Sequence, residues 1–313
     1  MGLKGAILFS SFGRSGRVRS GRSRSGKVWV GVALSVSVVI AGTVVAGVAT
    51  GGAAVAGHAA VTGKKGHHDN GGSGPVICRK DGRRTVNSYG VYYIVRNDVI
   101  LRERECITLV HKGPGFVVTK THADSPGGEN AAFPEVLYGC EWGLCTKHSV
   151  LPRRITRLKT VLTSWDASWR RAQGQFNVAY DIWFGYLHTI QGHALGAEVM
   201  IWLGTKHFGT PLHAPILRID GVRWYFGTHR ACSIYGCWKY ILFRRVVPAT
   251  HAHRLGLMPF FHYAEQRRLL SKRWFLKSID VGFEIWHQGL GLAVHKYSVR
   301  IKLHKLRHKR HRK

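Results

Sequence analysis

Short apolar stretches separated by turn-forming residues fill most of the chain after residue 75, and they constrain the fold more than any other feature. Each stretch spans five to nine residues, a length that is typical of β-strands. The clearest examples are Val91–Val95, Gly115–Thr119, Phe176–Phe184, Ala197–Leu203, Val222–Phe226, Trp238–Phe243 and Ala293–Ile301. Because Gly, Pro, Asn and Asp between the stretches favour turns, the pattern predicts an all-β sandwich.

One segment departs from this pattern. Met258–Leu270 carries apolar residues at helical spacing, which lets them share one side of a helix. These residues are Phe260, Phe261, Ala264, Leu269 and Leu270. We therefore expect a single helix packed against the sandwich.

The N-terminal segment 1–60 has the order of an export signal. Residues 1–30 contain seven basic side chains and no acid, and they lead into the apolar run Val28–Ala49 and then into small residues. The run could be removed with a cleaved signal peptide, or it could remain as an anchor that crosses a bilayer. Either outcome predicts a secreted or extracellular protein whose only membrane contact is this N-terminal segment.

Composition divides the rest of the chain into three parts. Residues 61–75 are rich in Gly and polar residues, so we expect a linker. Residues 76–301 hold the strand-like stretches and are expected to form one monomeric domain. Residues 302–313 form a basic tail.

The chain is strongly basic, with 47 Lys and Arg against 16 Asp and Glu and a formal net charge of +31. Residues 1–30 and 301–313 each contribute seven basic side chains, so 31 − 14 leaves about 17 net charges elsewhere. A field of this sign attracts polyanions, although a solvated basic tail explains the C-terminal charges equally simply. Because no nucleic-acid-binding motif accompanies the charge, we expect no nucleic-acid partner.

Six cysteines fit an exported protein. Two pairs, Cys140 with Cys145 and Cys232 with Cys237, each enclose four residues, and Cys78 and Cys106 complete an even number. In an oxidising compartment this pattern predicts disulfides, with the two close pairs as local links, although 15 connectivities are formally possible. Zinc is the alternative ligand, but the absence of CxxC spacing disfavours it.

Three carboxylates share a predicted strand face with large apolar side chains. The three sets are Asp181 with Trp183, Glu198 with Met200 and Trp202, and Glu284 with Trp286. A carboxylate among apolar residues loses hydration unless it is paired or hydrogen-bonded, and salt bridges to Arg or Lys would satisfy that need. The repeated tryptophans favour a sugar-binding cleft instead, because aromatic rings stack on the apolar faces of sugars.

Paired carboxylates are the chemical requirement for hydrolysis of a glycosidic bond. In the retaining reaction, two carboxyl groups about 5 to 5.5 Å apart act as nucleophile and as general acid/base. The acid must keep its proton near the working pH, which burial or a neighbouring like charge achieves. A third carboxylate beside the nucleophile can share a proton with it.

Three segments resemble glycoside hydrolase family 12, a family of small secreted endo-β-1,4-glucanases. They are Asn177–Phe184 (NVAYDIWF), Ala197–Leu203 (AEVMIWL) and Gly282–Trp286 (GFEIW), with Tyr138-Gly139-Cys140 as weaker support. The spacing between Asp181 and Glu198 along the chain is also similar to that of the family. The resemblance extends from about Ile77 to Ile301.

The resemblance implies a two-sheet, concanavalin-like jelly roll with a concave substrate cleft and one helix on the convex side. It implies that Glu198 is the nucleophile, that Glu284 is the general acid/base, and that Asp181 hydrogen-bonds the nucleophile. It also implies disulfides Cys78–Cys106 and Cys140–Cys145, and no cofactor or metal.

The expected substrate is a β-glucan: cellulose, mixed-linkage glucan or xyloglucan. Residues expected to contact it are Met200, Trp202, Trp286, Trp183, Trp142 and Asp98. The family also has a motif of the form Asn-Asn-x-Trp-Gly, whose tryptophan stacks on a sugar, whereas this chain has Ile100 and no tryptophan between Asn97 and Leu101. This difference and the basic charge leave a second hypothesis, a weakly active or non-catalytic binding protein of cell-envelope polysaccharides.

Overall fold

A computed structural model describes residues 74–78, 84–97, 99, 105–125, 128–189, 194–233 and 235–305. The expected signal segment, nearly all of the expected linker, most of the basic tail, Asp98 and Ile100 lie outside the described residues. No helix in the described part is long and apolar enough to cross a membrane.

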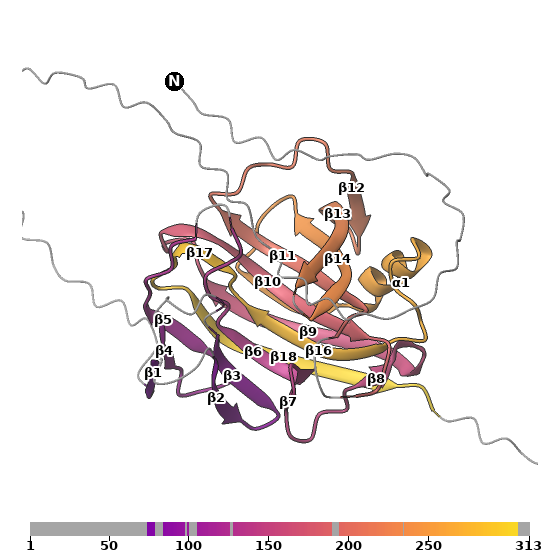
Figure 1. The fold of residues 1–313 in the computed structure, drawn as a ribbon, viewed down its shortest axis with the longest axis horizontal. Coiled ribbons are helices and arrows are strands. Elements are labelled where there is room, and N and C mark those ends of the chain that lie inside the picture. Colours follow the sequence, from indigo (N-terminus) through magenta and orange to yellow (C-terminus); the bar gives the residue numbers. More distant parts are fainter. Residues whose placement is uncertain are drawn as a thin grey trace, which may run out of the picture. The chain divides into compact units, whose positions relative to one another are not determined.

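Eighteen strands, one α-helix and one short 3₁₀ helix make up the described part of the chain (Figure 1). The strands are β1 (Val76–Cys78), β2 (Arg84–Tyr89), β3 (Tyr92–Asn97), β4 (Cys106–Leu109), β5 (Phe116–Lys120), β6 (Glu135–Glu141), β7 (Leu144–Cys145), β8 (Arg153–Arg154), β9 (Leu158–Ser168), β10 (Gly174–Gly185), β11 (Ala197–Lys206), β12 (Ile216–Ile219), β13 (Val222–Ser233), β14 (Gly236–Arg245), β15 (His251–Gly256), β16 (Phe275–Gly282), β17 (Ile285–Gln288) and β18 (Ala293–Leu303). The helix is α1 (Met258–Gln266), and the 3₁₀ helix is Ile155–Arg157.

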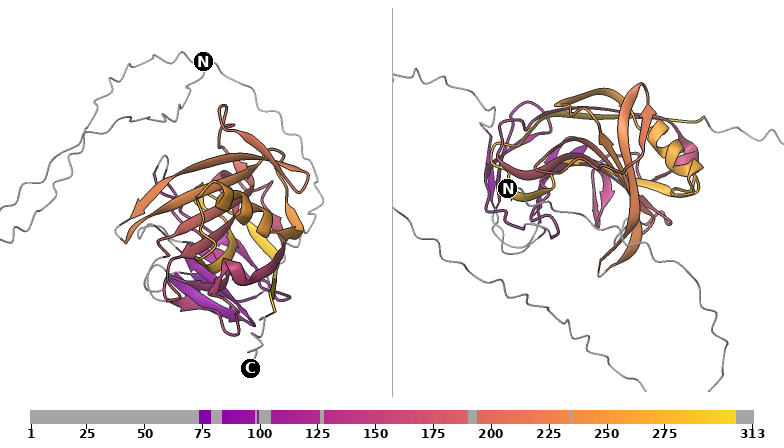
Figure 2. Two further views of the ribbon diagram at one scale, coloured as in Figure 1. Left: turned by 90° about the vertical axis from the view of Figure 1, so that its right-hand side faces the viewer. Right: turned by 90° about the horizontal axis from the view of Figure 1, so that it is seen from above.

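The strands form two sheets, as the sequence predicted. The small sheet has six strands in the order β1-β4-β5-β18-β9-β15. The large sheet has twelve, with β12-β13-β14-β11-β10-β16-β6-β3-β2 as its path and β17, β7 and β8 paired to β10, β6 and β16. Neighbours pair antiparallel except β11 and β14, which run parallel. Two further views show the layers and the curvature of the long strands (Figure 2).

One hydrophobic core lies between the sheets. On β11 the side chains of Val199, Ile201 and Leu203 belong to it, so Glu198 and the other alternate residues of that strand face away from the small sheet. Ring contacts cross between the layers, such as Trp165 of β9 against Tyr180 of β10 at 5.3 Å between centroids. The jelly-roll sandwich implied by the family resemblance is thereby confirmed. We call the side of the large sheet that carries Glu198 the acid-bearing face.

Helix α1 packs on the core side of the large sheet, which is the side opposite to the acid-bearing face. Phe260 and Phe261 are fully buried there, and Phe261 meets Phe184 edge-on at 5.0 Å between ring centroids. The helix ends at Gln266, before the predicted Leu270, because a Schellman motif terminates it. Arg268 adopts a left-handed φ of 58°, and Leu269 N–H donates to the carbonyl of Ala264 at 2.9 Å.

The predicted strand segments all coincide with strands whose ends differ by a few residues. The largest extension is in β13, which continues from Phe226 to Ser233 as one arm of a hairpin. At the C-terminus β18 continues to Leu303, into the expected tail.

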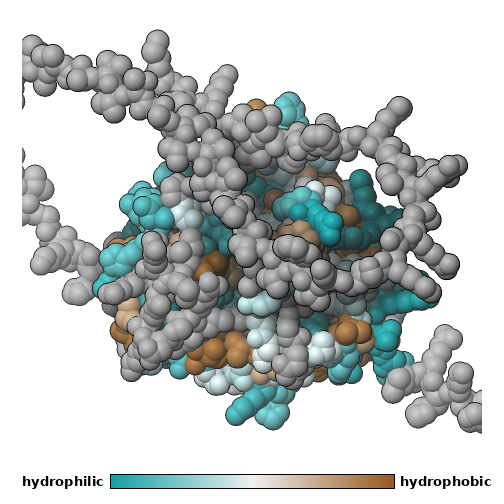
Figure 3. Space-filling model, in the orientation of Figure 1, coloured by the Kyte–Doolittle hydropathy of each residue, from teal (hydrophilic) through white to brown (hydrophobic). Residues whose placement is uncertain are grey.

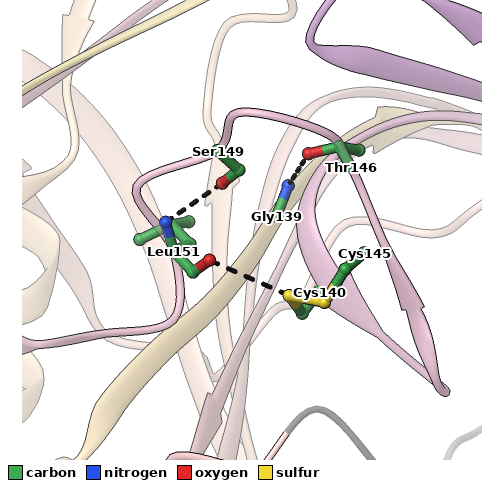
Figure 4. The surroundings of a disulfide bond; sticks show 6 residues. All are labelled: Gly139, Cys140, Cys145, Thr146, Ser149 and Leu151. Carbon is green, nitrogen blue, oxygen red and sulfur yellow. Dashed lines mark hydrogen bonds between the residues drawn. A yellow bond between two sulfur atoms is a disulfide. The ribbon is translucent and has the colours of Figure 1, made fainter.

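Three disulfides join the six cysteines as Cys78–Cys106, Cys140–Cys145 and Cys232–Cys237. The second one closes the β6–β7 hairpin, where Gly139 N–H donates to Thr146 Oγ1 at 3.0 Å (Figure 4). The third closes the end of the β13–β14 hairpin. The disulfide interpretation of the cysteines, rather than the zinc alternative, therefore describes this structure.

The surface visible in Figure 3 is mainly hydrophilic, with smaller hydrophobic patches between. Exposed large hydrophobic residues of the described part are spread over several elements and loops, among them Val76, Leu187, Leu212 and Leu290. Scattered apolar residues of this kind are normal on a soluble surface.

Candidate active site

Asp181 and Glu198 lie on neighbouring strands in the middle of the large sheet. Strands β10 and β11 pair so that Asp181 is opposite Met200 and Trp183 is opposite Glu198. Residues opposite each other in an antiparallel pair share a sheet face, so all four are on the acid-bearing face. Asp181 and Glu198 are only 7% and 6% exposed, which removes most of their hydration.

Glu284 reaches the same face by a different route from the one predicted. It is not in the middle of a strand but in the gap between β16 and β17. Strand β10 pairs with β16 at Ala179–Gly282 and with β17 at Phe176–Ile285. The two pairings have the same register, so β17 continues the path of β16 along β10. The prediction that Glu284 lies in the middle of a strand was wrong. Its backbone N–H pairs with a side chain of β10 instead of with a backbone carbonyl, which interrupts the strand here.

That side chain belongs to Asn177, which is fully buried. Its Oδ1 accepts a hydrogen bond from Glu284 N–H at 3.0 Å, and its Nδ2 donates to Glu284 Oε2. The backbone N–H of Asn177 also donates to the Glu284 carbonyl at 3.0 Å. Three hydrogen bonds therefore fix both the backbone and the carboxyl group of Glu284 against β10.

Indole groups hold the other two carboxylates. Trp238 of β14 donates from Nε1 to Glu198 Oε2 at 2.6 Å, and Trp183 donates to Asp181 Oδ2 at 3.0 Å. The hydrogen bond between Asp181 and Glu198 that the family resemblance implies is not formed in the described structure. The two groups interact electrostatically instead, because the charge of Glu198 raises the pKa of Asp181.

All three acids have raised pKa values, and burial is the largest cause in each case. Burial and the charge of Glu284 raise the pKa of Glu198 to about 8, against the lowering effect of the Trp238 hydrogen bond. Burial raises the pKa of Glu284 to about 7, against the Asn177 hydrogen bond. The pKa of Asp181 is raised by burial, by Glu198 and then by Glu141. The group consequently retains protons at neutral pH, as acid catalysis requires.

Salt bridges do not explain these carboxylates. Among the described residues, Asp181, Glu198 and Glu284 form no ion pair, and no Lys or Arg contributes to their pKa shifts. Their hydrogen-bond donors are the neutral indole groups of Trp183 and Trp238 and the amide of Asn177. The acids are therefore separated from the basic charge of the chain, which favours the functional interpretation over the structural one.

Aromatic rings continue across the acid-bearing face. Trp202 and Trp286, far apart in sequence, are connected by Phe208, whose ring centroid lies 5.6 Å from Trp202 and 5.0 Å from Trp286. Trp183 meets Trp238 at 5.5 Å. Of the predicted contact residues, Trp183 is on β10 with Asp181, and Met200 and Trp202 are on β11 with Glu198. Trp286 is on β17, which begins directly after Glu284.

Trp142 lies further out, at the tip of the β6–β7 hairpin. It is 37% exposed, and its ring meets that of Tyr235 edge-on at 4.9 Å between centroids. Tyr235 lies within the Cys232–Cys237 loop, so two disulfide-closed hairpins touch through this aromatic pair. Four strands of the large sheet, β14, β11, β10 and β16, separate β13 from β6 in the sheet order.

A second group of acids is buried in the same sheet. Carboxylate oxygens of Glu135, Glu141 and Asp280 lie within 4.8 Å of one another. Among the described residues, this is the group whose ligand atoms are close enough together to hold a metal ion. Each of the three makes a further interaction within the protein. Glu141 and Asp280 both raise the pKa of Asp181. Clustered acids alone do not define a metal site, and we assign them this electrostatic effect only.

Sequence reasoning missed Asn177, Trp238 and Tyr240. Tyr240 is opposite Glu198 on the parallel strand β14, and burial together with Glu284, Glu198 and Asp181 raises its pKa. Asn177 is within a segment that the sequence did single out, but its amide has no recognisable pattern. Trp238 and Tyr240 become neighbours of Glu198 only through the β11–β14 pairing, which joins segments that are far apart in the chain.

Comparison with known proteins agrees with this fold. The sequence model of glycosyl hydrolase family 12 matches residues 110–302, more than half of the chain. The chain belongs to this family. It is therefore a glycoside hydrolase, and both its membership and its fold were predicted correctly from sequence. A search of curated proteins gave no match.

Several solved structures of family 12 members are similar to this one. Endoglucanase cel12A from Rhodothermus marinus is 30% identical, with a TM-score of 0.66 over 73% of this chain and 99% of that one. A metagenome-derived family 12 endoglucanase is 28% identical, with a TM-score of 0.67 over 74% and 100%. A family 12 xyloglucanase from Bacillus licheniformis, at 20% identity and a TM-score of 0.63 over 73% and 100%, shares the fold.

Proposed function

We propose that this family 12 member is a retaining endo-β-1,4-glucanase that acts on the acid-bearing face. The observation that carries the proposal is the pair Glu198 and Glu284, both with raised pKa values and with Glu284 repelling a charge on Glu198. Such a pair titrates as a unit and shares a proton near neutral pH, and the retaining reaction begins from one carboxylate and one carboxylic acid. The order of the two pKa values would place this proton on Glu198; the assignment of Glu198 as the carboxylate follows the family resemblance and the Trp238 donor, which favours its ionised form. The similar endoglucanases support a β-glucan as substrate.

In the first step the Glu198 carboxylate attacks the anomeric carbon. The glycosidic C–O bond breaks as Glu284 transfers its proton to the leaving oxygen, which gives a glycosyl ester on Glu198. In the second step Glu284, now a carboxylate, takes a proton from water, and the resulting hydroxide attacks the anomeric carbon. Glu198 leaves as a carboxylate, Glu284 is again an acid, and the product keeps the configuration of the substrate.

The surrounding residues have supporting roles in this proposal. The Trp238 N–H stabilises the ionised form of Glu198, and Asn177 orients Glu284 toward the leaving oxygen. Protonated Asp181 prevents a third negative charge from accumulating beside the nucleophile. Trp202, Phe208 and Trp286 form a connected aromatic group, in which the partly exposed Phe208 and Trp286 are available to contact a sugar.

The proposal is tested with Glu198→Ala and Glu284→Ala on a soluble β-glucan, with reducing ends measured over time. Both variants should lose at least about a thousandfold in kcat/KM, whereas Glu265→Ala on α1 should retain wild-type turnover as a matched control. The initial anomer of the product, read by proton NMR, should be β. An α anomer, or near wild-type turnover by either variant, would refute the assignment.

The same assay separates the second hypothesis, a non-catalytic polysaccharide-binding protein. In that case the purified protein would retain β-glucan in an affinity gel but release no reducing ends.

We also propose that the protein is secreted, because three disulfides suit an oxidising compartment. Detection of a chain that lacks the segment 1–60 in the medium of expressing cells would test this.

A further inference from the structure

The acid-bearing face continues past the acids over β14 and β13, which follow β11 in the order of the large sheet (Figure 1). In one row across the strands, Asp181 is opposite Met200, and Met200 is opposite Leu242. Leu242 is in turn opposite Gly227 of β13. Because residues opposite each other share a sheet face, this first row extends the acid-bearing face as far as Gly227.

A second row runs beside the first and begins at the proposed nucleophile. Glu198 is opposite Tyr240, and Tyr240 is opposite His229. The imidazole ring of His229 stacks on the Tyr240 ring, with 4.5 Å between centroids and 25° between planes. Burial lowers the pKa of His229 and raises the pKa of Tyr240, so both rings are uncharged at neutral pH. The second row thus leads from the nucleophile to two stacked, neutral rings.

Large side chains border the first row on its other side as well. A third row, with one residue each from β11, β14 and β13, consists of Trp202, Arg244 and Tyr225. Arg244 donates from Nη1 to the Gly209 carbonyl at 2.8 Å and from Nη2 to the Phe208 carbonyl at 3.4 Å. It thereby fastens the loop that carries Phe208. The first row is therefore a strip that lies between two rows of longer side chains.

Gly227 leaves a gap among the side chains of β13 at the end of this strip. Tyr225 and His229 share its face, two residues to either side, and residues four apart along a strand are separated by roughly 13 Å. A Cβ atom at Gly227 would meet nothing within 4 Å, so the space above it is open. We call this space the Gly227 gap. It is wide enough to admit a sugar ring.

The usual structural reasons for a glycine inside a strand do not apply to Gly227. Its φ is not positive, and the β13–β14 pairing keeps one register from Trp224 to Ser233, without a bulge. No described atom is close enough to exclude a side chain. Glycine weakens a strand, and where these causes are missing it marks a place where a ligand approaches the backbone. The position of Gly227 on the acid-bearing face indicates a ligand that also covers the acids.

We propose that the strip from Asp181 to Gly227 extends the substrate cleft, and that the Gly227 gap holds a further sugar of the β-glucan beside the Tyr240 and His229 rings. This inference rests on the proposed function and adds a subsite to it. A neutral sugar suits the gap, because uncharged rings offer it an apolar surface. Gly227 determines specificity here, since a side chain would take the place of the sugar. The protein should therefore prefer long chains to short ones.

Hydrolysis of cellohexaose and of cellotriose by the whole protein tests this subsite. Gly227→Leu fills the gap without a clash at Cβ. We expect its kcat/KM for cellohexaose to fall at least about tenfold, mainly through a higher KM, because a sugar that stacks on a ring is displaced. The kcat/KM for cellotriose, which can bind without the gap, should stay close to that of wild type. His229→Ala should also weaken cellohexaose hydrolysis, and His229→Phe should restore it.

Thr228→Leu is the matched control. Thr228 is exposed and follows Gly227 on β13, but it is opposite the core residue Ile241 and so faces away from the acids. The control thus adds an apolar side chain at the neighbouring position on the other face of the same strand. It should hydrolyse both oligosaccharides like wild type.

Affinity electrophoresis in a gel that contains β-glucan measures binding without hydrolysis. In this gel Gly227→Leu should be retarded less than wild type and Thr228→Leu. The proposal is overturned if Gly227→Leu matches wild type, if Thr228→Leu loses as much, or if Gly227→Leu loses cellohexaose and cellotriose hydrolysis equally. If wild type hydrolyses neither oligosaccharide but only Gly227→Leu loses retardation, the proposed function fails and the subsite stands.

Discussion

The Trp238 hydrogen bond lowers the pKa of Glu198, and replacing Trp238 with phenylalanine tests the electrostatic reasoning most directly. The indole N–H donates to Glu198 Oε2 at 2.6 Å, and the carboxyl group is only 6% exposed, so water cannot readily replace that donor. Hydrogen bonds to charged groups contribute about 1.5–3 kcal/mol, and one pKa unit corresponds to about 1.4 kcal/mol. Trp238→Phe should therefore raise the pKa of Glu198 by roughly 1–2 units above its value of about 8.

The expected readout is the pH dependence of kcat/KM on a soluble β-glucan. The proposed nucleophile acts only when it is ionised, so a higher pKa of Glu198 lowers kcat/KM at every pH at which Glu198 is mostly protonated. The variant should therefore lose about 10- to 100-fold in kcat/KM below pH 8 and much less at a pH above its raised pKa. Phenylalanine preserves an aromatic ring beside Trp183, which limits other effects.

Trp169→Phe is the matched control for this experiment. It removes an indole hydrogen bond of 3.2 Å to the Ala249 carbonyl, so it loses a donor without touching a carboxylate. The control should lose some stability and keep the wild-type dependence of kcat/KM on pH. If Trp238→Phe loses no activity, or loses the same factor at every pH, the indole does not control the ionisation of Glu198, and the reasoning fails.

Further expectations concern stability. Because burial raises the pKa of Glu198 to about 8, the folded protein binds more protons than the unfolded chain between its ordinary pKa near 4.5 and that value. Stability should thus fall as pH rises through this window, and Glu198→Gln should raise Tm at pH 8 in calorimetry; an equal fall in both proteins would contradict this. Gly282→Ala would drive a Cβ into the Pro134 carbonyl oxygen, beside the proposed acid/base. It should cost about 2–4 kcal/mol in denaturant unfolding and lower activity, and a wild-type midpoint would show that the backbone can yield. Replacing Cys232 and Cys237 with serine should cost about 2 kcal/mol, estimated from the short loop that the disulfide closes. An unchanged Tm would mean that the hairpin is held by its strand pairing alone.

The sequence predicted the layers of the fold because the strand period is local. Alternation on Ala197–Leu203 assigned Val199 and Ile201 to the core and Glu198 to the other face, and the structure agrees. At Glu284 the face was also predicted correctly, because Phe283 and Ile285 belong to the core, but the expected continuous strand is interrupted between Gly282 and Ile285. Asn177 causes that interruption through its side chain, and hydropathy contains no information about such a hydrogen bond.

Long-range pairing limited the prediction of the site in the same way. Trp238 is far from Glu198 in sequence, and the two meet only because β14 runs parallel to β11. Periodicity assigns a residue to a face, but it does not identify the neighbouring strand or its register. The three acids were therefore predictable from sequence, whereas the donors that determine their ionisation were not.

The distribution of charge in this protein also has a functional consequence. A chain with a net charge of +31 would be expected to lower the pKa of its few acids, yet those of Asp181, Glu198 and Glu284 are all raised. The positive field fails to lower them because burial dominates at each acid and no cation reaches them among the described residues. The basic side chains can thus attract an anionic partner elsewhere on the surface, while the acid pair keeps the proton that a glycosidic oxygen needs in order to leave.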